Sequence, residues 1–185
     1  MTKLPDPSRK CRESRCQQGF SLIELLIVVA IILIIAAIAI PNFLRAKMAA
    51  NESSAVENLR NVTTASVVYN STWGNGYPPA LTNLGGSGVS ATCDQANLLD
   101  PIITTAPFTK SGYIFNYAGE DGPASQGPGC GGPGFIGFFV TAAPQSPGLT
   151  GTRSFCTEES GVIHFDLTGV PASSETACEA LNILQ

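Results

Sequence analysis

The sequence has few of the residues that enzymes use for catalysis and metal binding. Its 185 residues include one histidine, and there is no Cys-x-x-Cys spacing, no Walker A motif and no Gly-x-Ser-x-Gly elbow. We therefore expect no zinc site, no nucleotide hydrolysis and no serine hydrolase chemistry. His164 and Asp166 lie on one face of a predicted strand, but no nucleophile signal accompanies them, so His164 is predicted to be structural. The sequence predicts a protein that is not an enzyme.

Basic residues are also scarce, with 10 Lys and Arg against 14 Asp and Glu and a formal net charge of −4. Residues 1–19 hold five basic and two acidic side chains, so the rest of the chain carries about −7. This acidic balance argues against a broad nucleic-acid surface. Glycine (19) and proline (13) are frequent after Gly74 without a fixed period, which favours turns and irregular loops over a repeat architecture.

One long apolar run, FSLIELLIVVAIILIIAAIAI, extends from Phe20 to Ile40 and contains a single charge, Glu24. At ~1.5 Å per residue it can cross a hydrocarbon core of roughly 30 Å. It has no polar face, unlike a helix in a soluble core. Residues 1–19 are basic and polar and are expected to stay in the cytoplasm, and no small-residue cleavage site follows the run. An isolated carboxylate in such a run requires a partner or a position near the headgroups.

Residues 19–47, GFSLIELLIVVAIILIIAAIAIPNFLRAK, resemble the amino terminus of type IV pilins and type II secretion pseudopilins. The resemblance implies cleavage by a prepilin peptidase after Gly19 and methylation of the new amine on Phe20. It also implies that Glu24 pairs with the amino terminus of a neighbouring subunit. Many family members have a helix-breaking glycine within the run, whereas this chain has Leu33 and Ile34 there.

The resemblance also implies a route and a set of partners. The precursor would sit in the inner membrane and be extracted by an assembly platform and its ATPase into a homo-oligomeric filament. That filament is expected to be an extracellular pilus serving motility, adhesion or DNA uptake. The alternatives are a periplasmic pseudopilus of type II secretion and a minor pilin that binds a ligand. Nucleic acid is not expected as a partner by default.

The chain is predicted to divide into a leader (1–19), a membrane or filament-core helix (20–40), an amphipathic helix (41–72) and a β-rich head (73–185). Pro41 is expected to kink the helix without ending it. The amphipathic half shows 3–4 spacing. Its predicted apolar face holds Ala55, Leu59, Val62 and Tyr69, and its predicted polar face holds Glu52, Glu57, Asn58 and Arg60. Arg45 and Lys47 would interact with headgroups or with acids on neighbouring subunits, or simply be solvated.

Aromatic and β-branched segments predict three or four antiparallel strands in the head. They are Tyr113–Tyr117, Phe135–Ala142, Arg153–Cys156 and Gly161–Leu167. Trp73 and Tyr77 are expected to pack at the junction between helix and head. With a short helix near Cys178, the pattern predicts an α+β pilin fold in which the long helix packs on a small sheet with Gly/Pro-rich loops.

Six cysteines are present, of which Cys11 and Cys16 would leave with the leader. The four that remain are Cys93, Cys130, Cys156 and Cys178, and in an oxidising compartment they predict two disulfides. Three pairings are open. We favour Cys93–Cys130 with Cys156–Cys178, because each bridge closes a loop of moderate length.

No cofactor is required by any motif, but calcium is a minor hypothesis, because some pseudopilins hold calcium in a loop of the head. The acidic pairs Glu120-Asp121 and Glu158-Glu159 are the candidate ligands. Neither shows the alternating acidic pattern of an EF-hand. Solvated loop carboxylates are the alternative interpretation.

Overall fold

The structure, a computed structural model, describes residues 20–86, 88, 90–104 and 106–184. Gly19 and the rest of the predicted leader lie outside the described residues, so the cleavage position stays a prediction. The chain divides into two compact units, Met1–Pro41 and Asn42–Gln185. The helix α1, Leu22–Trp73, belongs partly to each of them.

Helix α1 is 52 residues long and contains Pro41 without being ended by it, as the sequence predicted. Proline lacks an N–H, so one intrahelical hydrogen bond is missing there. The helix stops where Gly74 adopts a left-handed φ of 57°, with its N–H donating to the carbonyl of Asn70 at 2.9 Å. A left-handed glycine after the last turn is a common helix terminus, because glycine has no Cβ to strain.

The second half of α1 packs against the head through the face that the 3–4 spacing predicted. Ala55, Leu59, Val62 and Tyr69 are all buried. The predicted polar face was wrong at two positions, because Glu52 and Asn58 are buried as well. Each has found hydrogen-bond partners, which is the condition for burying a polar side chain.

The head contains one six-stranded antiparallel sheet in the order β1-β2-β3-β4-β5-β6, so every strand pairs with the strands before and after it in the chain. The strand bounds are β1 Phe108–Lys110, β2 Tyr113–Pro123, β3 Phe135–Pro144, β4 Ser154–Glu158, β5 Ile163–Asp166 and β6 Asn182–Ile183. The four predicted strands correspond to β2–β5. The short edge strands β1 and β6 were not predicted.

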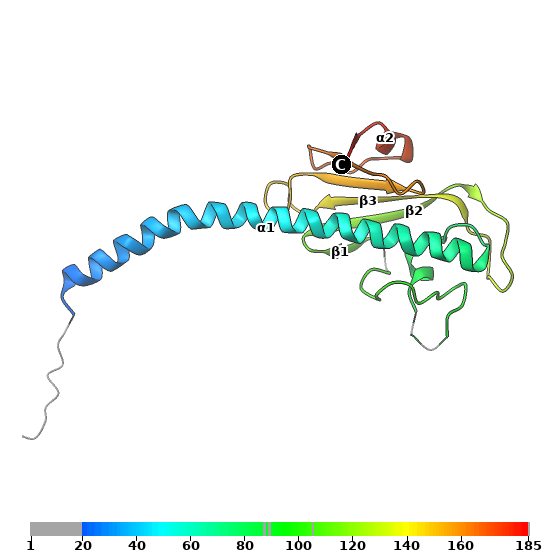
Figure 1. Ribbon diagram of the computed structural model, residues 1–185, viewed down its shortest axis with the longest axis horizontal. Helices are drawn as coiled ribbons and strands as arrows, with labels where there is room; N and C mark the ends of the chain where they lie inside the picture. Colours follow the sequence, from blue (N-terminus) through cyan, green and yellow to red (C-terminus); the bar gives the residue numbers. More distant parts are fainter. Residues whose placement is uncertain (1–19, 87, 89, 105, 185) are drawn as a thin grey trace, which may run out of the picture. The chain divides into compact units, whose positions relative to one another are not determined.

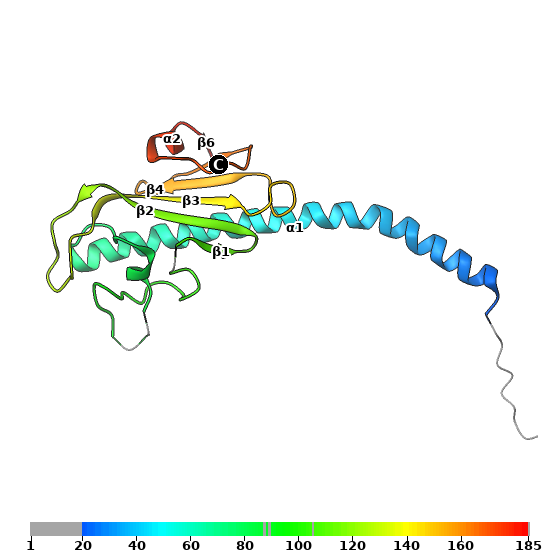
Figure 2. The ribbon, with the colours of Figure 1, turned by 180° about the vertical axis from the view of Figure 1, so that it is seen from behind.

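The inner face of the sheet packs on α1, and the two form adjacent layers of the head (Figures 1 and 2). Alternate residues of the central strands, among them Phe115, Phe138 and Phe155, are completely or almost completely buried in this core. Period-two alternation places these aromatics on the side of the helix. The core therefore sits between one helix face and one sheet face, as expected for an α+β domain.

The outer face is partly covered by the last segment of the chain. This segment includes the short helix α2, Glu175–Glu179, which begins where the Ser174 hydroxyl accepts a hydrogen bond from the Ala177 N–H. Phe139, Cys156 and Cys178 form a second small buried cluster there. The disulfide Cys156–Cys178 joins α2 to β4, so the C-terminal segment is covalently held on the sheet.

The segment between α1 and β1 is irregular apart from the 3₁₀ turn η1, Leu81–Leu84, and it supplies apolar side chains to the main core. The second disulfide, Cys93–Cys130, joins this segment to the connection between β2 and β3. The two bridges are the pairing favoured from loop lengths. The Tyr69 hydroxyl lies 3.0 Å from the Cys93 sulfur, so the end of α1 contacts this bridge directly.

Candidate functional site

The first turn of α1 contains the only charged side chain of the apolar run. The Glu24 Oε2 atom accepts a hydrogen bond from the Ser21 N–H at 2.9 Å, and the Leu25 N–H donates to the Ser21 carbonyl. This is the backward half of a capping box, in which the N3 carboxylate satisfies the free N–H of the N-cap residue. Glu24 therefore already has a local partner within its own chain.

Within the part of the chain that the structure describes, the apolar run has almost no partner. Phe20 is 85% exposed, and the large aliphatic side chains that follow it are exposed through Ile40. By length and composition this part of α1 could cross a membrane. An unbroken band of exposed aliphatic side chains is unusual on a soluble monomer and marks a surface that lipid or protein covers. The Arg45 and Lys47 side chains, which follow in the second unit, are exposed to solvent.

A buried ion pair fastens the first turns of α1 within the head to the start of β4. The Glu52 carboxylate accepts hydrogen bonds from the backbone N–H groups of Thr152 and Arg153 and from the Thr152 hydroxyl, at 2.9 to 3.2 Å. Its other oxygen lies 2.8 Å from Arg153 Nε and 2.7 Å from a terminal guanidinium nitrogen. Burial raises the pKa of Glu52, but these donors outweigh burial and hold the pKa below its ordinary value.

The contact between Glu52 and Arg153 was not predicted from the sequence. Glu52 was assigned to the solvated face, and Arg153 was noted only as a predicted strand residue. The spacing of Glu52 from Ala55 and Leu59 does fit the buried face of a helix, and that signal was present. The Ser21-x-x-Glu24 pattern of a capping box could also have been found in advance.

The fold separates the carboxylates of each acidic pair considered for calcium and brings some of them together with other acids. Asp121, Glu159 and Glu175 come together with carboxylate oxygens within 4.8 Å of one another, and Glu158 and Glu179 form a second group with Glu175. The Glu159 Oε2 atom is buried and accepts no hydrogen bond from any described residue. Burial, and then the neighbouring carboxylates, raise the pKa of Glu175. Such a group could hold a divalent cation, or it could remain a site of mutual repulsion.

Glu120 and Asp121 do not lie in a loop, which corrects the sequence interpretation. Strand β2 continues through both of them to Pro123, with an irregularity where Asp121 and Gly122 adopt left-handed φ values of 61° and 78°. The turn-rich connection, which the sequence predicted to begin at Gly119, therefore begins at Ala124, five residues later. Asp121 belongs to the acidic group, whereas Glu120 lines a separate cavity on the outer face.

The other residues singled out in the sequence make hydrogen bonds or packing contacts within the head. Nδ1 of the buried His164 lies 3.1 Å from the Leu181 carbonyl oxygen, and Asp166 accepts from the Thr168 N–H, so each is engaged elsewhere. Trp73 packs on Tyr69 with ring centroids 5.3 Å apart, and Tyr77 contacts Phe138 edge-on at 4.9 Å. These aromatic pairs lie at the junction of helix and head, where the sequence predicted them.

The fold and the amino-terminal segment together define a class of protein. A long helix with an exposed apolar first part, followed by an antiparallel sheet packed on its second part, is an α+β pilin fold. Residues 14–40 match the family model described as the prokaryotic N-terminal methylation motif. Residues 14–40 are therefore similar to the amino-terminal segment of proteins that carry this motif.

One curated relative extends this match. The chain is 56% identical over 48 residues to the type IV major pilin protein PilA of Myxococcus xanthus (strain DK1622). The match covers 26% of this chain and 22% of the relative. No solved structure matches the chain. The similarity therefore concerns the amino-terminal segment, and the head has to be interpreted from its own residues.

Proposed function

We propose that this chain is the structural subunit of an extracellular type IV pilus. The observation that carries the proposal is the exposed apolar band from Phe20 to Ile40, which lies within the matched methylation motif. Packing of this band against copies of itself would replace lipid by close helix contacts. The head would then form the outer part of the filament.

Processing and register follow from the same segment. A prepilin peptidase would cut after Gly19 and leave a methylated amine on Phe20. The amine of one subunit would meet the Glu24 carboxylate of its neighbour, because a carboxylate and an amine in apolar surroundings stabilise each other. In the separate chain Glu24 accepts from the Ser21 N–H. Assembly would add the amine to this arrangement or substitute it for the amide.

The route implies an inner-membrane precursor and three further partners, namely the peptidase, an assembly platform and its ATPase. Mass spectrometry on sheared surface filaments, beside the membrane fraction, tests the route. We expect a chain that begins at N-methylated Phe20, is abundant in the filaments, and has lost four hydrogens to two disulfides. An intact leader, or a cut at another position, would contradict the proposal.

The second candidate is a type II secretion pseudopilin in a short periplasmic filament. The grouped carboxylates Asp121, Glu159 and Glu175 favour it to the extent that they bind calcium, since calcium in the head is a property of some pseudopilins. A correctly processed chain found only in the membrane fraction would favour this candidate over a surface pilus.

The register role of Glu24 has its own test. Glu24→Gln keeps an acceptor for the Ser21 N–H but removes the charge, whereas Glu24→Ala removes both. If the charge is required, both variants reduce filament yield by tenfold or more. Normal yield and normal order in the Gln variant would show that pairing with the amine is not needed.

A further inference from the structure

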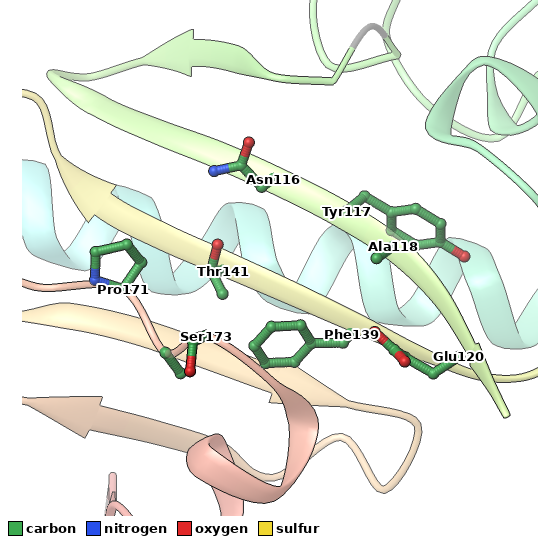
Figure 3. Close-up of a pocket in the computed structure, with 9 residues that line it drawn as sticks. Asn116, Tyr117, Ala118, Glu120, Phe139, Thr141, Pro171 and Ser173 are labelled. Atoms are coloured by element: carbon green, nitrogen blue, oxygen red, sulfur yellow. The ribbon is translucent and has the colours of Figure 1, made fainter.

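The outer face of the sheet contains a cavity that the C-terminal segment leaves uncovered. It has a volume of about 260 Å³ and lies between strands β2 and β3 on one side and the segment 171–173 on the other. Figure 3 shows the Phe139 ring between β3 and Ser173, with Asn116 and Thr141 on neighbouring strands. The cavity is separate from the apolar band and from the methylation motif.

Small residues create this space. In the register of β2 and β3, Ala118 is paired with Phe139, and Glu120 is paired with Gly137. Directly opposed side chains in a sheet normally contact each other across about 4.5–5.5 Å. Because Ala118 and Gly137 reach only a short way or not at all, Phe139 has no bulky neighbour on β2 and Glu120 has none on β3. The hollow is thus set by the sequence of the two strands.

Besides Tyr117, whose hydroxyl donates to the Pro78 carbonyl, four polar side chains border the hollow: Asn116, Glu120, Thr141 and Ser173. Within the described residues no hydrogen bond engages any of these side chains. Thr141 is only 4% exposed and borders the cavity. Its hydroxyl can donate to and accept from a molecule that enters the hollow.

The charge of the surroundings limits the kind of ligand. Glu120 is the only ionisable carboxylate of the lining, no basic side chain lines the cavity, and Asp121 follows Glu120 in the chain. Anionic groups would be repelled here, since nothing offsets the negative charge. An amide, two hydroxyls and a carboxylate offer both donors and acceptors at short range, and Phe139 and Pro171 offer apolar surface.

We propose that this cavity binds one neutral pyranose unit of a carbohydrate. Sugar hydroxyls would donate to Glu120 and accept from Asn116, Thr141 and Ser173, while a C–H face packs on Phe139 or Pro171. The volume is slightly below the ~300–1,000 Å³ typical of drug-sized ligands, so the cavity would hold a single sugar unit rather than an oligosaccharide. A segment of a second copy of the chain is the competing occupant.

The proposal is tested on the full chain in a detergent that carries no sugar headgroup, so the result does not depend on filament assembly. The probes are the methyl glycosides of glucose, galactose, mannose and N-acetylglucosamine, with methyl glucuronide as the anionic comparison. Saturation-transfer NMR and titration should show at least one neutral glycoside binding with a dissociation constant on the order of 1 mM. The glucuronide should bind at least about tenfold more weakly.

Three variants locate the binding. Ala118→Leu should fill the hollow and abolish binding, while Thr141→Val and the exposed Asn116→Ala should each weaken it about fivefold or more. Ala80→Leu, at an exposed position before η1, is the matched control and should bind as the parent does. Asn116→Ala keeps the test decisive even if a buried substitution disturbs folding. Absence of binding by every neutral glycoside, or binding that ignores Ala118→Leu and Asn116→Ala, would overturn the proposal. If the glycosides do not bind and Ala118→Leu stops filament assembly, the cavity belongs to a neighbouring copy instead.

Discussion

Ile27 and Leu59 lie in the same helix, yet 51% of Ile27 is exposed and none of Leu59 is. The second half of α1 has its own sheet to cover an apolar face, and polar residues occupy most of the other side. The first half is apolar all round, and its large aliphatic side chains are exposed within the described residues. The comparison teaches that one helix can depend on two environments, an intramolecular core for one half and lipid or other subunits for the other.

The sharpest way to break this comparison is to truncate one buried and one exposed aliphatic side chain. Leu59→Ala should lower the free energy of unfolding of the head by about 3 kcal/mol, because it leaves a cavity in the core. Ile32→Ala should leave that free energy unchanged and reduce filament yield instead. Denaturant unfolding of the full chain in detergent, followed by the fluorescence of Trp73, measures the first effect. A loss of head stability in the Ile32 variant would show that the halves are not independent.

The disulfide Cys156–Cys178 gives the next largest expected effect. Replacing both cysteines by serine should destabilise the head by about 3 kcal/mol, since the bridge closes a loop between residues 22 positions apart. The loss should appear first in the C-terminal segment, which should become accessible to proteases while the α1–sheet core stays intact. Limited proteolysis with mass spectrometry checks this order. Simultaneous cleavage throughout the head would contradict it.

The buried pair of Glu52 and Arg153 should contribute somewhat less. Glu52→Gln should cost about 2 kcal/mol at pH 7, which is below the ~3–5 kcal/mol for fully buried pairs because Arg153 is partly exposed. Glu57→Gln, an exposed acid on the same helix, is the matched control. The pKa of folded Glu52 lies below its ordinary 4.5, so its contribution is present above that pH and lost as the pH falls through the folded pKa. Chemical denaturation of the parent protein and of Glu52→Gln from pH 7 to pH 3 should show that their free energies of unfolding converge in acid.

The acidic group of Asp121, Glu159 and Glu175 should lower the stability of the head at neutral pH. The effect should be smaller than the stabilisation by the Glu52–Arg153 pair. The pKa of Glu175 is raised, so folding is favoured while it is protonated, and that advantage is lost as the pH rises through the folded pKa. Glu175→Gln should therefore stabilise the head slightly at pH 7 and have no effect near pH 3. Thermal unfolding at the two pH values measures the difference. Destabilisation at pH 7 would mean that the carboxylate has a favourable partner.

Adding calcium tests whether the acidic group of Asp121, Glu159 and Glu175 is a metal site. If Asp121, Glu159 and Glu175 bind it, millimolar calcium should raise the melting temperature at pH 7, and a chelator should reverse the increase. Glu159→Gln should lose the response, whereas Glu120→Gln should keep it, because Glu120 is outside the group. An equal response in both variants would exclude these carboxylates as the ligands.

The sequence predicted most of the parts that depend on local pattern. The apolar run, the 3–4 spacing and the absence of glycine before Gly74 were enough for α1, and the aromatic segments were enough for β2–β5. The edge strands β1 and β6 were missed because three-residue and two-residue strands carry no alternation to detect. Strand β1 pairs with β2 across a tight turn, whereas β6 pairs with a neighbour that is more distant in the chain, with Ile183 opposite His164.

Long-range contacts also explain the errors in the candidate sites. Glu52 is 100 and 101 residues from the two backbone amides that make its burial tolerable, so its local sequence resembled a solvated face. Asp121 and Glu175 come from different ends of the head and meet only through the fold. The bulge at Asp121 extended a strand into a region where Gly and Pro indicated a loop. The motif around Glu24 is local, which is why the sequence was sufficient to recognise it.

The strand order of the sheet follows the order of the chain, and this has a consequence for how the head can form. Each strand pairs with the one that precedes it, and no strand has to wait for a partner from the far end of the polypeptide. Pairing between consecutive strands favours rapid folding, because less chain entropy is lost than in pairing strands from opposite ends of the chain. A head that emerges amino terminus first could therefore grow strand by strand from the β1 edge. Oxidation of Cys156 with Cys178 would be the last step, fixing the C-terminal cover on a sheet already in place.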